Sequence, residues 1–280
     1  MANAIHVWGV AQVLNGRVLL RLEDHDRRRC RPEYEAAILE DLEWLGLEPQ
    51  HGLSAELRSG KSPFRQSDNH VRYTTALQQL GRGFKVYNCD CSRKEIAGES
   101  DVPDQETRYP ARCRERNLED QEGRGIRVTI QPGAERFTDG LLGEQEQNPS
   151  EQCGDLLLRD RLGNWTYQFA VTVDDTEQNV DLVIRGQDLL ASTGRQIRLA
   201  RMLGRNTPPV YMHHRLIRHA TGAKLSKSNR DTGVRDLRAA GMSPGSVLGQ
   251  AAYLTGLIDT PRELSARDLG SLFISSGAVS

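Results

Sequence analysis

The sequence predicts an α/β protein built on a parallel sheet, and two patterns carry that prediction. Short apolar runs of strand length, at 18–20, 84–87 and 182–184, alternate with longer segments in which apolar residues recur at helical spacing. Short connections between such strands and helices favour a parallel sheet with helices packed on it. The 280 residues are 37% hydrophobic and 27% charged, which fits a folded protein of one large domain or two modest ones.

The first elements alternate as such a fold requires. Apolar residues at 5–14 share one helix face, and Gly16 follows as a stop. The apolar run at 18–20 predicts a buried strand, and the charged cluster Arg21–Asp26 follows it, where a parallel strand would open into a cleft. Two more helices and a strand are expected next, at Pro32–Leu45, Asn69–Leu80 and Phe84–Tyr87.

The middle of the chain has a different composition. Residues 88–153 are rich in Pro, Gly, Arg and Glu and show little periodicity, which predicts an insertion with its own small fold. Regular patterning resumes at Asp155, a helix is expected over Asp188–Leu203, and the part from about Asp231 is predicted to be helical. We therefore divide the chain into four parts. Residues 1–87 and 154–230 are the two halves of the α/β domain, residues 88–153 are the insertion between them, and residues 231–280 are a C-terminal segment.

The bulk properties narrow the class of protein. No apolar run approaches the roughly 18–20 residues that span a bilayer, and the first residues lack the features of a secretion signal. We therefore expect a monomer in the cytoplasm with no membrane contact. The formal net charge of −1 neither indicates nor excludes nucleic-acid binding. The excess of Lys and Arg between His213 and Arg238 fits either a phosphate-binding surface or a solvated basic face.

The cysteine pattern favours a metal over disulfides. The chain has five cysteines, an odd count without a secretion signal, and three of them, Cys89, Cys91 and Cys113, lie within 25 residues. A Cys-x-Cys pair can supply two thiolates from one tight turn, and zinc prefers four ligands in a tetrahedron. Three ordinary thiols are the alternative. Cys30 and Cys153 have no such pattern and are expected to be packing residues.

The sharpest local motif is Lys224-Leu-Ser-Lys-Ser228. Two ammonium groups three residues apart, interleaved with hydroxyls, suit a loop that wraps a triphosphate, because lysine is a compact charge that can follow phosphate oxygens. Stabilising that shifting charge is the main task in nucleotidyl transfer. Five residues rich in Lys and Ser also occur by chance in loops, so the motif depends on its context.

That context resembles a known family. In order along the chain stand Arg21–Asp26, Arg31–Glu35, Val183–Leu190 and Lys224–Ser228, and together they resemble the catalytic domain of glutamyl-tRNA synthetases. The last segment looks like the second class I signature, KMSKS. The resemblance runs from Asn3 to about Phe273. Only 52 residues follow Ser228. In this short C-terminal part the chain resembles the glutamyl-queuosine tRNA(Asp) synthetases, whose catalytic core stands alone.

The resemblance implies a fold and a reaction. The fold would be a class I Rossmann-like parallel sheet with a zinc-bearing, acceptor-binding-like insertion and a helical, stem-contact-like C-terminal segment. The reaction would use ATP with Mg²⁺ to convert L-glutamate to glutamyl-adenylate and then transfer it to the queuosine base of tRNA(Asp). Lys227, helped by Lys224, would hold the departing pyrophosphate, with Ser226 and Ser228 in the ATP site. There are two alternatives: an ordinary glutamyl-tRNA synthetase that is truncated at both ends, and a tRNA-binding relic.

The resemblance also assigns substrate and metal ligands. Glu23 would meet the amino group of glutamate, Tyr167 would offer its hydroxyl, and Arg185 would pair with a carboxylate in two-pronged geometry. The residues alone allow other roles: an ion pair of Glu23 with Arg21 or Arg27, a core position for Tyr167, and a salt bridge of Arg185 with Asp188 or Asp181. For the one structural zinc, Tyr109 would join the three thiolates as fourth ligand: Cys89, Cys91, Tyr109 and Cys113.

One expected motif is absent from this sequence. Class I synthetases begin with a strand and a motif close to His-Ile-Gly-His, and by family comparison the chain starts some two dozen residues late. His6-Val-Trp-Gly9 does not replace the motif, because it has one histidine and falls in the predicted helix. Losing one charge-stabilising donor can cost about 10²–10³ in rate. If the protein truly starts at Met1, it is therefore expected to be inactive or nearly so. A misplaced start or a fragmentary sequence is the preferred interpretation.

Overall fold

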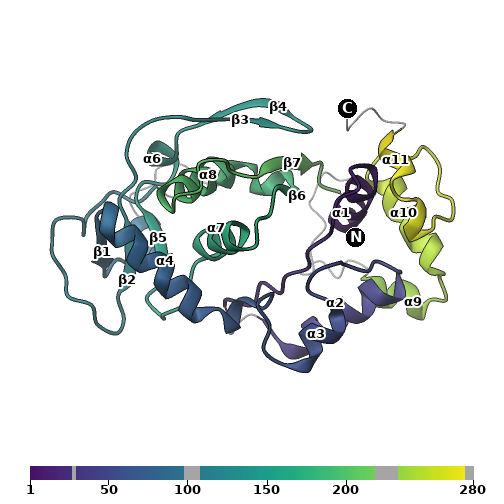
Figure 1. Ribbon diagram of the computed structural model, residues 1–280, viewed down its shortest axis with the longest axis horizontal. Coiled ribbons are helices and arrows are strands. Elements are labelled where there is room, and N and C mark those ends of the chain that lie inside the picture. Colours follow the sequence, from purple (N-terminus) through teal and green to yellow (C-terminus); the bar gives the residue numbers. More distant parts are fainter. Residues whose placement is uncertain (27–29, 98–107, 218–232, 275–280) are drawn as a thin grey trace.

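The computed structural model describes residues 1–26, 30–97, 108–217 and 233–274 (Figure 1). The described strands are β1 (Val86–Cys89), β2 (Gly125–Val128), β3 (Glu135–Asp139), β4 (Gly143–Gln147), β5 (Leu156–Arg159), β6 (Leu182–Gly186) and β7 (Val210–His214). They form an antiparallel sheet in the order β1-β2-β5 and a second sheet in the order β4-β3-β7-β6. In the second sheet β7 pairs in parallel with both β3 and β6, whereas β3 and β4 form an antiparallel hairpin.

Helices surround both sheets. The described α-helices are α1 (Ala2–Val13), α2 (Pro32–Trp44), α3 (Ser54–Ser59), α4 (His70–Gly83), α5 (Arg93–Ala97), α6 (Pro149–Gln152), α7 (Tyr167–Glu177), α8 (Thr193–Met202), α9 (Val234–Ala239), α10 (Pro244–Leu254) and α11 (Ser271–Ile274). The helices predicted at 5–14, 32–45 and 69–80 are confirmed as α1, α2 and α4. Gly46, two residues after α2, has a φ of 72°, the left-handed conformation that often follows a helix. No described helix could span a membrane.

The predicted parallel sheet is only partly correct. The run at 18–20 makes isolated bridges to the segment that follows α2, such as Leu19 with His51, and forms no regular strand. The strand predicted at 84–87 lies at Val86–Cys89 and pairs antiparallel with β2. Short apolar runs show that backbone is extended and buried, but they do not reveal the direction of the partner strand. The predicted helix at 188–203 begins as a 3₁₀ helix, Gln187–Ser192, before α8.

Strands from the predicted insertion contribute to both sheets. β2 lies between β1 and β5, and the hairpin of β3 and β4 extends the sheet that contains β6 and β7. In Figure 1 this hairpin forms the upper edge of the molecule, away from β1 and β2. The stretch 88–153 is therefore tied to the rest of the chain on two sides, and the four-part division remains a prediction.

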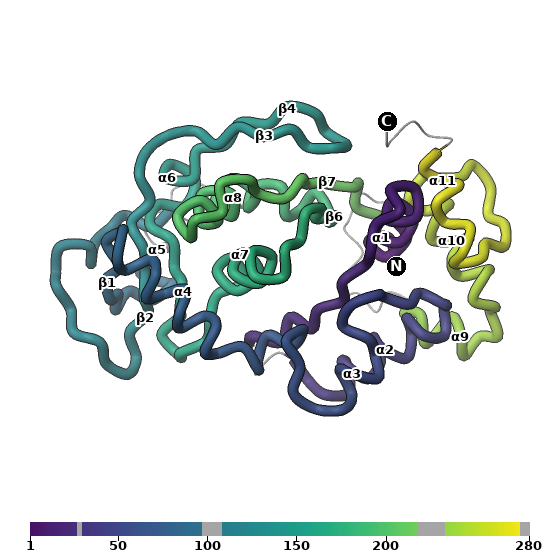
Figure 2. The backbone as a smooth tube through the Cα atoms, in the orientation of Figure 1, coloured from purple at the N-terminus to yellow at the C-terminus, as the bar shows by residue number. Residues whose placement is uncertain are grey.

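Two hydrophobic clusters hold the elements in place. One gathers side chains from α4, α7, α8, β2 and β5 around Phe169 and Leu199, both fully buried. The other joins α1 to α10 and α11, so the first residues of the tube lie beside the last described ones (Figure 2). There Gly9 faces Phe273 so closely that an added Cβ would lie 2.2 Å from a ring carbon. Helix α1 is thus fixed by the C-terminal helices.

Helix α7 occupies the centre of the molecule. In Figure 1 it lies beneath α8, β6 and β7, and it packs against α8 and α4. Residues 169–175 of this helix are all buried, including two consecutive carboxylates, Asp174 and Asp175. Carboxylates are almost never fully buried unless they are paired, so this helix marks the polar centre of the fold.

Candidate functional site

A cavity of about 1590 Å³ lies between α1, α7, β6 and the segment 14–23. Its lining includes Glu23, Tyr167 and Arg185, the three residues predicted to contact glutamate, together with Arg21 and Asp175. Tyr167 is the first residue of α7, Arg185 lies on β6, and Glu23 follows the run at 18–20. Three segments distant in sequence therefore bring both signs of charge to one cavity, which is ample for an amino acid.

The buried guanidinium of Arg185 is held by neutral acceptors. Its Nε donates to His213 Nε2 at 2.9 Å, its Nη1 to Gln196 Oε1 at 2.7 Å and its Nη2 to Thr193 Oγ1 at 2.9 Å. A longer bond of 3.4 Å runs from Nη2 to the carbonyl of Leu189. Arginine carries five N–H groups, so one N–H on Nη1 is left for a ligand. The expected two-pronged pairing would require one of these bonds to be exchanged.

Arg185 has no ion-pair partner in the part of the chain that the structure describes. The salt bridge with Asp188 or Asp181, which the sequence left open, is not formed. A buried cation with neutral neighbours is costly, because its lost hydration is not repaid by an adjacent anion. The aromatic ring of Tyr211, 5.0 Å from the guanidinium carbon, offers only partial compensation. A ligand carboxylate would supply the missing charge.

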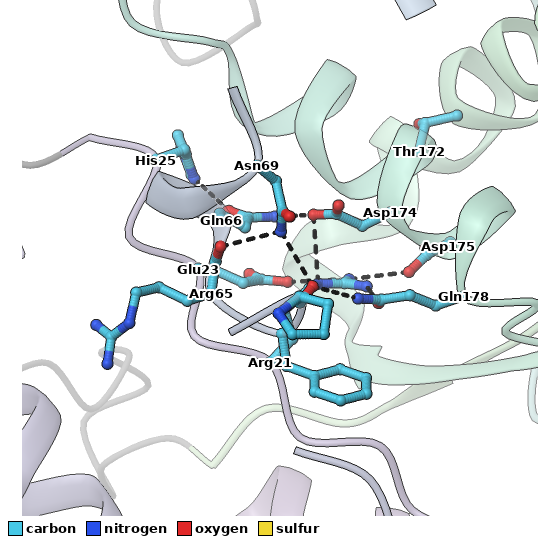
Figure 3. A network of polar contacts seen from close by, with 12 residues as sticks. Arg21, Glu23, His25, Arg65, Gln66, Asn69, Thr172, Asp174, Asp175 and Gln178 are labelled. Atoms are coloured by element: carbon cyan, nitrogen blue, oxygen red, sulfur yellow. Dashed lines mark hydrogen bonds and ion pairs between the residues drawn. The ribbon is translucent and has the colours of Figure 1, made fainter. Parts of the chain in front are cut away.

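Arg21 organises the anionic side of the cavity (Figure 3). Its Nη2 contacts Asp175 Oδ1 at 2.8 Å and Glu23 Oε1 at 3.3 Å, and its Nη1 donates to Gln178 Oε1 at 2.8 Å. The ion pair of Glu23 with Arg21 that the sequence allowed is therefore present, but inside the cavity. The Glu23 side chain remains 39% exposed there, so its carboxylate is accessible to a ligand.

Asp174 connects α7 to α4 and to the short segment that precedes α4. Its fully buried carboxylate accepts from Gln66 Nε2 at 2.9 Å, Arg72 Nη1 at 2.7 Å and Tyr73 Oη at 2.8 Å. Figure 3 shows Gln66 between Asp174 and His25, whose Nδ1 lies 2.7 Å from Gln66 Oε1. These contacts anchor α7, which carries the cavity residues Tyr167 and Asp175, against α4. Sequence reasoning missed Asp174. The available signal was a pair of adjacent carboxylates, Asp174 and Asp175, next to the mostly apolar run 169–173.

The cavity shifts the titration of its acidic groups. Loss of hydration raises the pKa of Glu23 and of Asp175 above their usual range, while the neighbouring Arg21 opposes the shift in both. Loss of hydration and the charge of Glu23 raise the pKa of Tyr167 to about 12. The Tyr167 hydroxyl is therefore protonated at neutral pH, and among the described residues it has no hydrogen-bond partner. It is available to a ligand.

The arrangement suits a zwitterion that carries an extra carboxylate. Carboxylates of Glu23 and Asp175 attract an ammonium group, and the guanidinium of Arg185 attracts an anion. The predicted phosphate-binding residues lie outside the described residues, so their roles remain predictions: Lys224, Ser226, Lys227 and Ser228.

The three cysteines predicted to bind zinc lie together. The Sγ atoms of Cys89, Cys91 and Cys113 are all within 4.8 Å of one another, and those of Cys91 and Cys113 are 3.5 Å apart. Two thiolates bound to tetrahedral zinc at about 2.3 Å are roughly 3.8 Å apart, so a small adjustment would fit the metal. Tyr109 Oη lies 3.4 Å from Cys89 Sγ, which makes it available as a fourth ligand.

A buried cation accompanies this cluster. Arg127 stacks over the Tyr109 ring, with its guanidinium carbon 3.6 Å from the ring centre, and its Nε donates to Cys89 Sγ at 3.3 Å. A site of three thiolates around one zinc ion is anionic, and this guanidinium would offset part of its charge. Cys153 is buried as expected, whereas Cys30 is exposed and the packing role predicted for it is wrong.

Zinc binding is expected to depend on Cys113. The purified chain should hold one zinc ion, measured by inductively coupled plasma mass spectrometry, and Cys113→Ser should hold less than about a tenth of that, because three strong ligands become two. Removal of the metal by a chelator should lower the melting temperature of the native chain and leave that of the Cys113→Ser variant unchanged. Cys30→Ser, at an exposed thiol remote from the cluster, is the matched control. Equal metal content in both variants would exclude this site.

Comparison with known proteins shows that this fold is a catalytic domain of the class I tRNA synthetase type. The chain matches the family model "tRNA synthetases class I (E and Q), catalytic domain" over residues 2–257. The chain belongs to this family. The predicted class is therefore confirmed, with one antiparallel and one mixed sheet in place of the parallel sheet expected.

The similar curated proteins include several that are named glutamyl-Q tRNA(Asp) synthetase. The chain is 38% identical over 261 residues to the glutamyl-Q tRNA(Asp) synthetase of Nitratidesulfovibrio vulgaris, covering 90% of this chain and 80% of that protein. It is 36% identical over 282 residues to the protein of the same name from Symbiobacterium thermophilum, covering 97% and 86%. These relatives are synthetases by name, and the resemblance expected from the motifs is confirmed.

Solved structures agree on the fold. The crystal structure of the glutamate-tRNA synthetase from Elizabethkingia anophelis matches with a TM-score of 0.76 at 23% identity, over 96% of this chain and 61% of that one. A glutamate tRNA ligase from Elizabethkingia meningosepticum in complex with its amino acid matches with a TM-score of 0.74, also at 23% identity. It is covered over 60% of its length, so the chain spans about three fifths of these two synthetases.

Proposed function

We propose that this chain binds L-glutamate in the cavity, activates it with ATP and Mg²⁺ as glutamyl-adenylate, and transfers it to the queuosine base of tRNA(Asp). One observation carries the proposal. The Arg185 guanidinium, which has no ion-pair partner among the described residues, meets the carboxylates of Glu23 and Asp175 in one cavity. Membership of the family and the names of its relatives support the nucleotide and tRNA steps.

Binding would place each charge of glutamate against its opposite. The ammonium group would lie against Glu23 and Asp175, one carboxylate would face Arg185, and the Tyr167 hydroxyl would donate to or accept from the ligand. Activation needs the α-carboxylate to attack the α-phosphorus in line, with pyrophosphate leaving. The protein contributes alignment and charge stabilisation to this step, and no covalent intermediate on a side chain is required.

The binding step is tested by isothermal titration calorimetry. L-Glutamate should bind, and L-glutamine should bind at least about tenfold more weakly, because its amide cannot supply the charge that Arg185 lacks. L-Aspartate should also bind more weakly, since its carboxylate is one methylene shorter. Equal affinity for glutamate and glutamine would contradict this assignment of the cavity.

The later steps need separate assays. Pyrophosphate exchange reports adenylate formation, and Lys227→Ala should reduce it far more than it weakens glutamate binding. Transfer of labelled glutamate should be compared on tRNA(Asp) with queuosine, on the same tRNA without the modified base, and on tRNA(Glu). Transfer to the first alone would support the proposal. Charging of tRNA(Glu) instead would identify an ordinary glutamyl-tRNA synthetase.

Glutamate affinity is expected to fall as the solution becomes acidic. Glu23 and Asp175 have raised pKa values, and each must be ionised to attract the ammonium group, so affinity is lost as pH decreases through those values. The loss should approach a factor of ten per pH unit for each carboxylate that protonates.

The pH dependence can be measured calorimetrically above about pH 5, where the ligand's own side-chain carboxylate, with a pKa near 4.3, stays mostly ionised. Glu23→Gln is the matched variant, because it removes one of the two titrating groups. Its affinity should be lower at neutral pH and should vary less with pH. An unchanged pH profile in this variant would show that Glu23 does not meet the ammonium group.

A further inference from the structure

A buried pair, Asp139 and His213, stands directly behind Arg185. Arg185 on β6 and His213 on β7 are register partners in the parallel sheet, and β3 ends with Asp139 on the other side of β7. His213 Nδ1 lies 2.5 Å from Asp139 Oδ2, and both side chains have no exposed surface. The three side chains thus form a line across neighbouring strands, from a carboxylate through an imidazole to the cavity wall.

The hydrogen bonds determine where the imidazole proton lies. Arg185 Nε–H can only donate, so His213 Nε2 must accept and carries no proton. The ring proton is then on Nδ1, where it is donated to Asp139. Loss of hydration lowers the pKa of His213, with the Asp139 hydrogen bond opposing this, which is consistent with a neutral ring.

Asp139 is itself anchored. Its Oδ1 accepts the backbone N–H groups of Leu141 and Leu142 at 3.0 Å and that of His213 at 3.2 Å. Three donors on one oxygen leave Oδ2 for the imidazole. The carboxylate therefore acts on Arg185 only through the ring, as an orienting group and not as a direct ion-pair partner.

We infer that Asp139 and His213 are positioning residues that hold the Arg185 guanidinium at the cavity wall while leaving its charge available to a ligand carboxylate. A direct carboxylate partner would hold the guanidinium as firmly but would compete with the ligand. A neutral ring fixed in one tautomer orients it without neutralising it. Thr193 and Gln196 hold the other nitrogens, so the group is preorganised before the ligand arrives.

The ligand named in this inference rests on the proposed function, whereas the positioning of Arg185 does not. Two measurements therefore test it separately. Long-range ¹H–¹⁵N correlation spectra of the histidine rings report the tautomer in the absence of ligand. For His213 we expect a protonated Nδ1 and an unprotonated Nε2 between pH 6 and 8. A ring protonated at Nε2, or at both nitrogens, would overturn the inference whether or not glutamate binds.

The second measurement is calorimetric titration of L-glutamate into three variants of the whole chain. His213→Gln keeps an acceptor near the Nε2 position and should bind within about threefold of the native chain, whereas His213→Leu leaves Arg185 Nε without an acceptor and should bind at least about tenfold more weakly. His214→Gln is the control at the adjacent buried histidine, whose ring contacts His6 and Asn3 and not Arg185. It should bind as the native chain does.

The outcomes distinguish the positioning of Arg185 from the proposed function. Native-like binding by a folded His213→Leu variant would overturn the positioning role, and so would equal losses in the Gln and Leu variants with unchanged melting temperatures. If the leucine variant does not fold, the tautomer spectrum of the native chain and the glutamine variant decide. If the native chain shows the expected tautomer but binds no glutamate, the proposed function fails while the positioning of Arg185 stands.

Discussion

Replacing Arg185 with methionine is expected to weaken L-glutamate binding by at least about 100-fold without lowering the melting temperature. Truncating one partner of a desolvated charge pair costs about 2–5 kcal/mol, and 2.7 kcal/mol is about 100-fold in affinity. Stability should change little, because two effects oppose each other. The variant loses the hydrogen bonds of Arg185 to His213, Gln196 and Thr193, but it also removes a buried cation that has no ion-pair partner among the described residues. Residues kept for binding at the expense of stability show this combination.

Calorimetry with L-glutamate and a thermal melt of each variant provide the measurement. Arg136→Met is the matched control, because Arg136 lies on the β3–β4 hairpin with an exposed side chain paired to Glu146. It should change neither affinity nor melting temperature. A methionine variant that melts far below the native chain, or that still binds glutamate tightly, would show that Arg185 serves the fold and not the ligand.

Replacing Asp174 with alanine is expected to lower the free energy of unfolding by about 3–5 kcal/mol, the range observed when one partner of a buried charged pair is removed. The variant would leave the donors of Gln66, Arg72 and Tyr73 without their acceptor in a region closed to water. Urea unfolding followed by circular dichroism measures the change. Since α7 carries both Asp174 and the cavity residue Tyr167, glutamate binding should weaken as well.

The matched control for Asp174 is Glu146→Gln, which neutralises a carboxylate in an exposed ion pair. It should leave the unfolding curve unchanged, because exposed pairs contribute little. Similar unfolding curves for the Asp174 and Glu146 variants would mean that the buried network is not a stabilising element. A shifted midpoint with an unchanged slope would confirm that the effect is on stability and not on the compactness of the unfolded state.

Local features of the fold could be predicted from the sequence. The helices at 5–14, 32–45 and 69–80 follow from apolar spacing and from residues that begin or end helices, which act within one or two turns. The residues Glu23, Tyr167 and Arg185 were found through motifs, and the structure brings all three to one cavity. Strand direction could not be predicted, because an apolar run such as 84–87 looks alike in parallel and antiparallel sheets.

The supporting residues escaped prediction because their partners are remote. Asp139 and His213 are 74 residues apart, and Asp174 is 108 residues from Gln66. Each looks unremarkable within its own segment, and its role appears only when the sheet and α7 bring the partners together. The sequence also left open a salt bridge of Arg185 with Asp188 or Asp181. Within the described part of the chain Arg185 has no ion-pair partner, and an imidazole sets its orientation.

Through the contact between Gly9 and Phe273, substitutions far from the cavity can change its shape. Helix α1 supplies Asn3, Val7 and Trp8 to the cavity lining, and its other side rests on an aromatic ring with no space to spare. Close-packed interiors transmit displacement and do not absorb it. A larger side chain at position 9, or a different aromatic side chain at position 273, would displace α1 toward the cavity. Natural variation at the two positions should therefore be correlated.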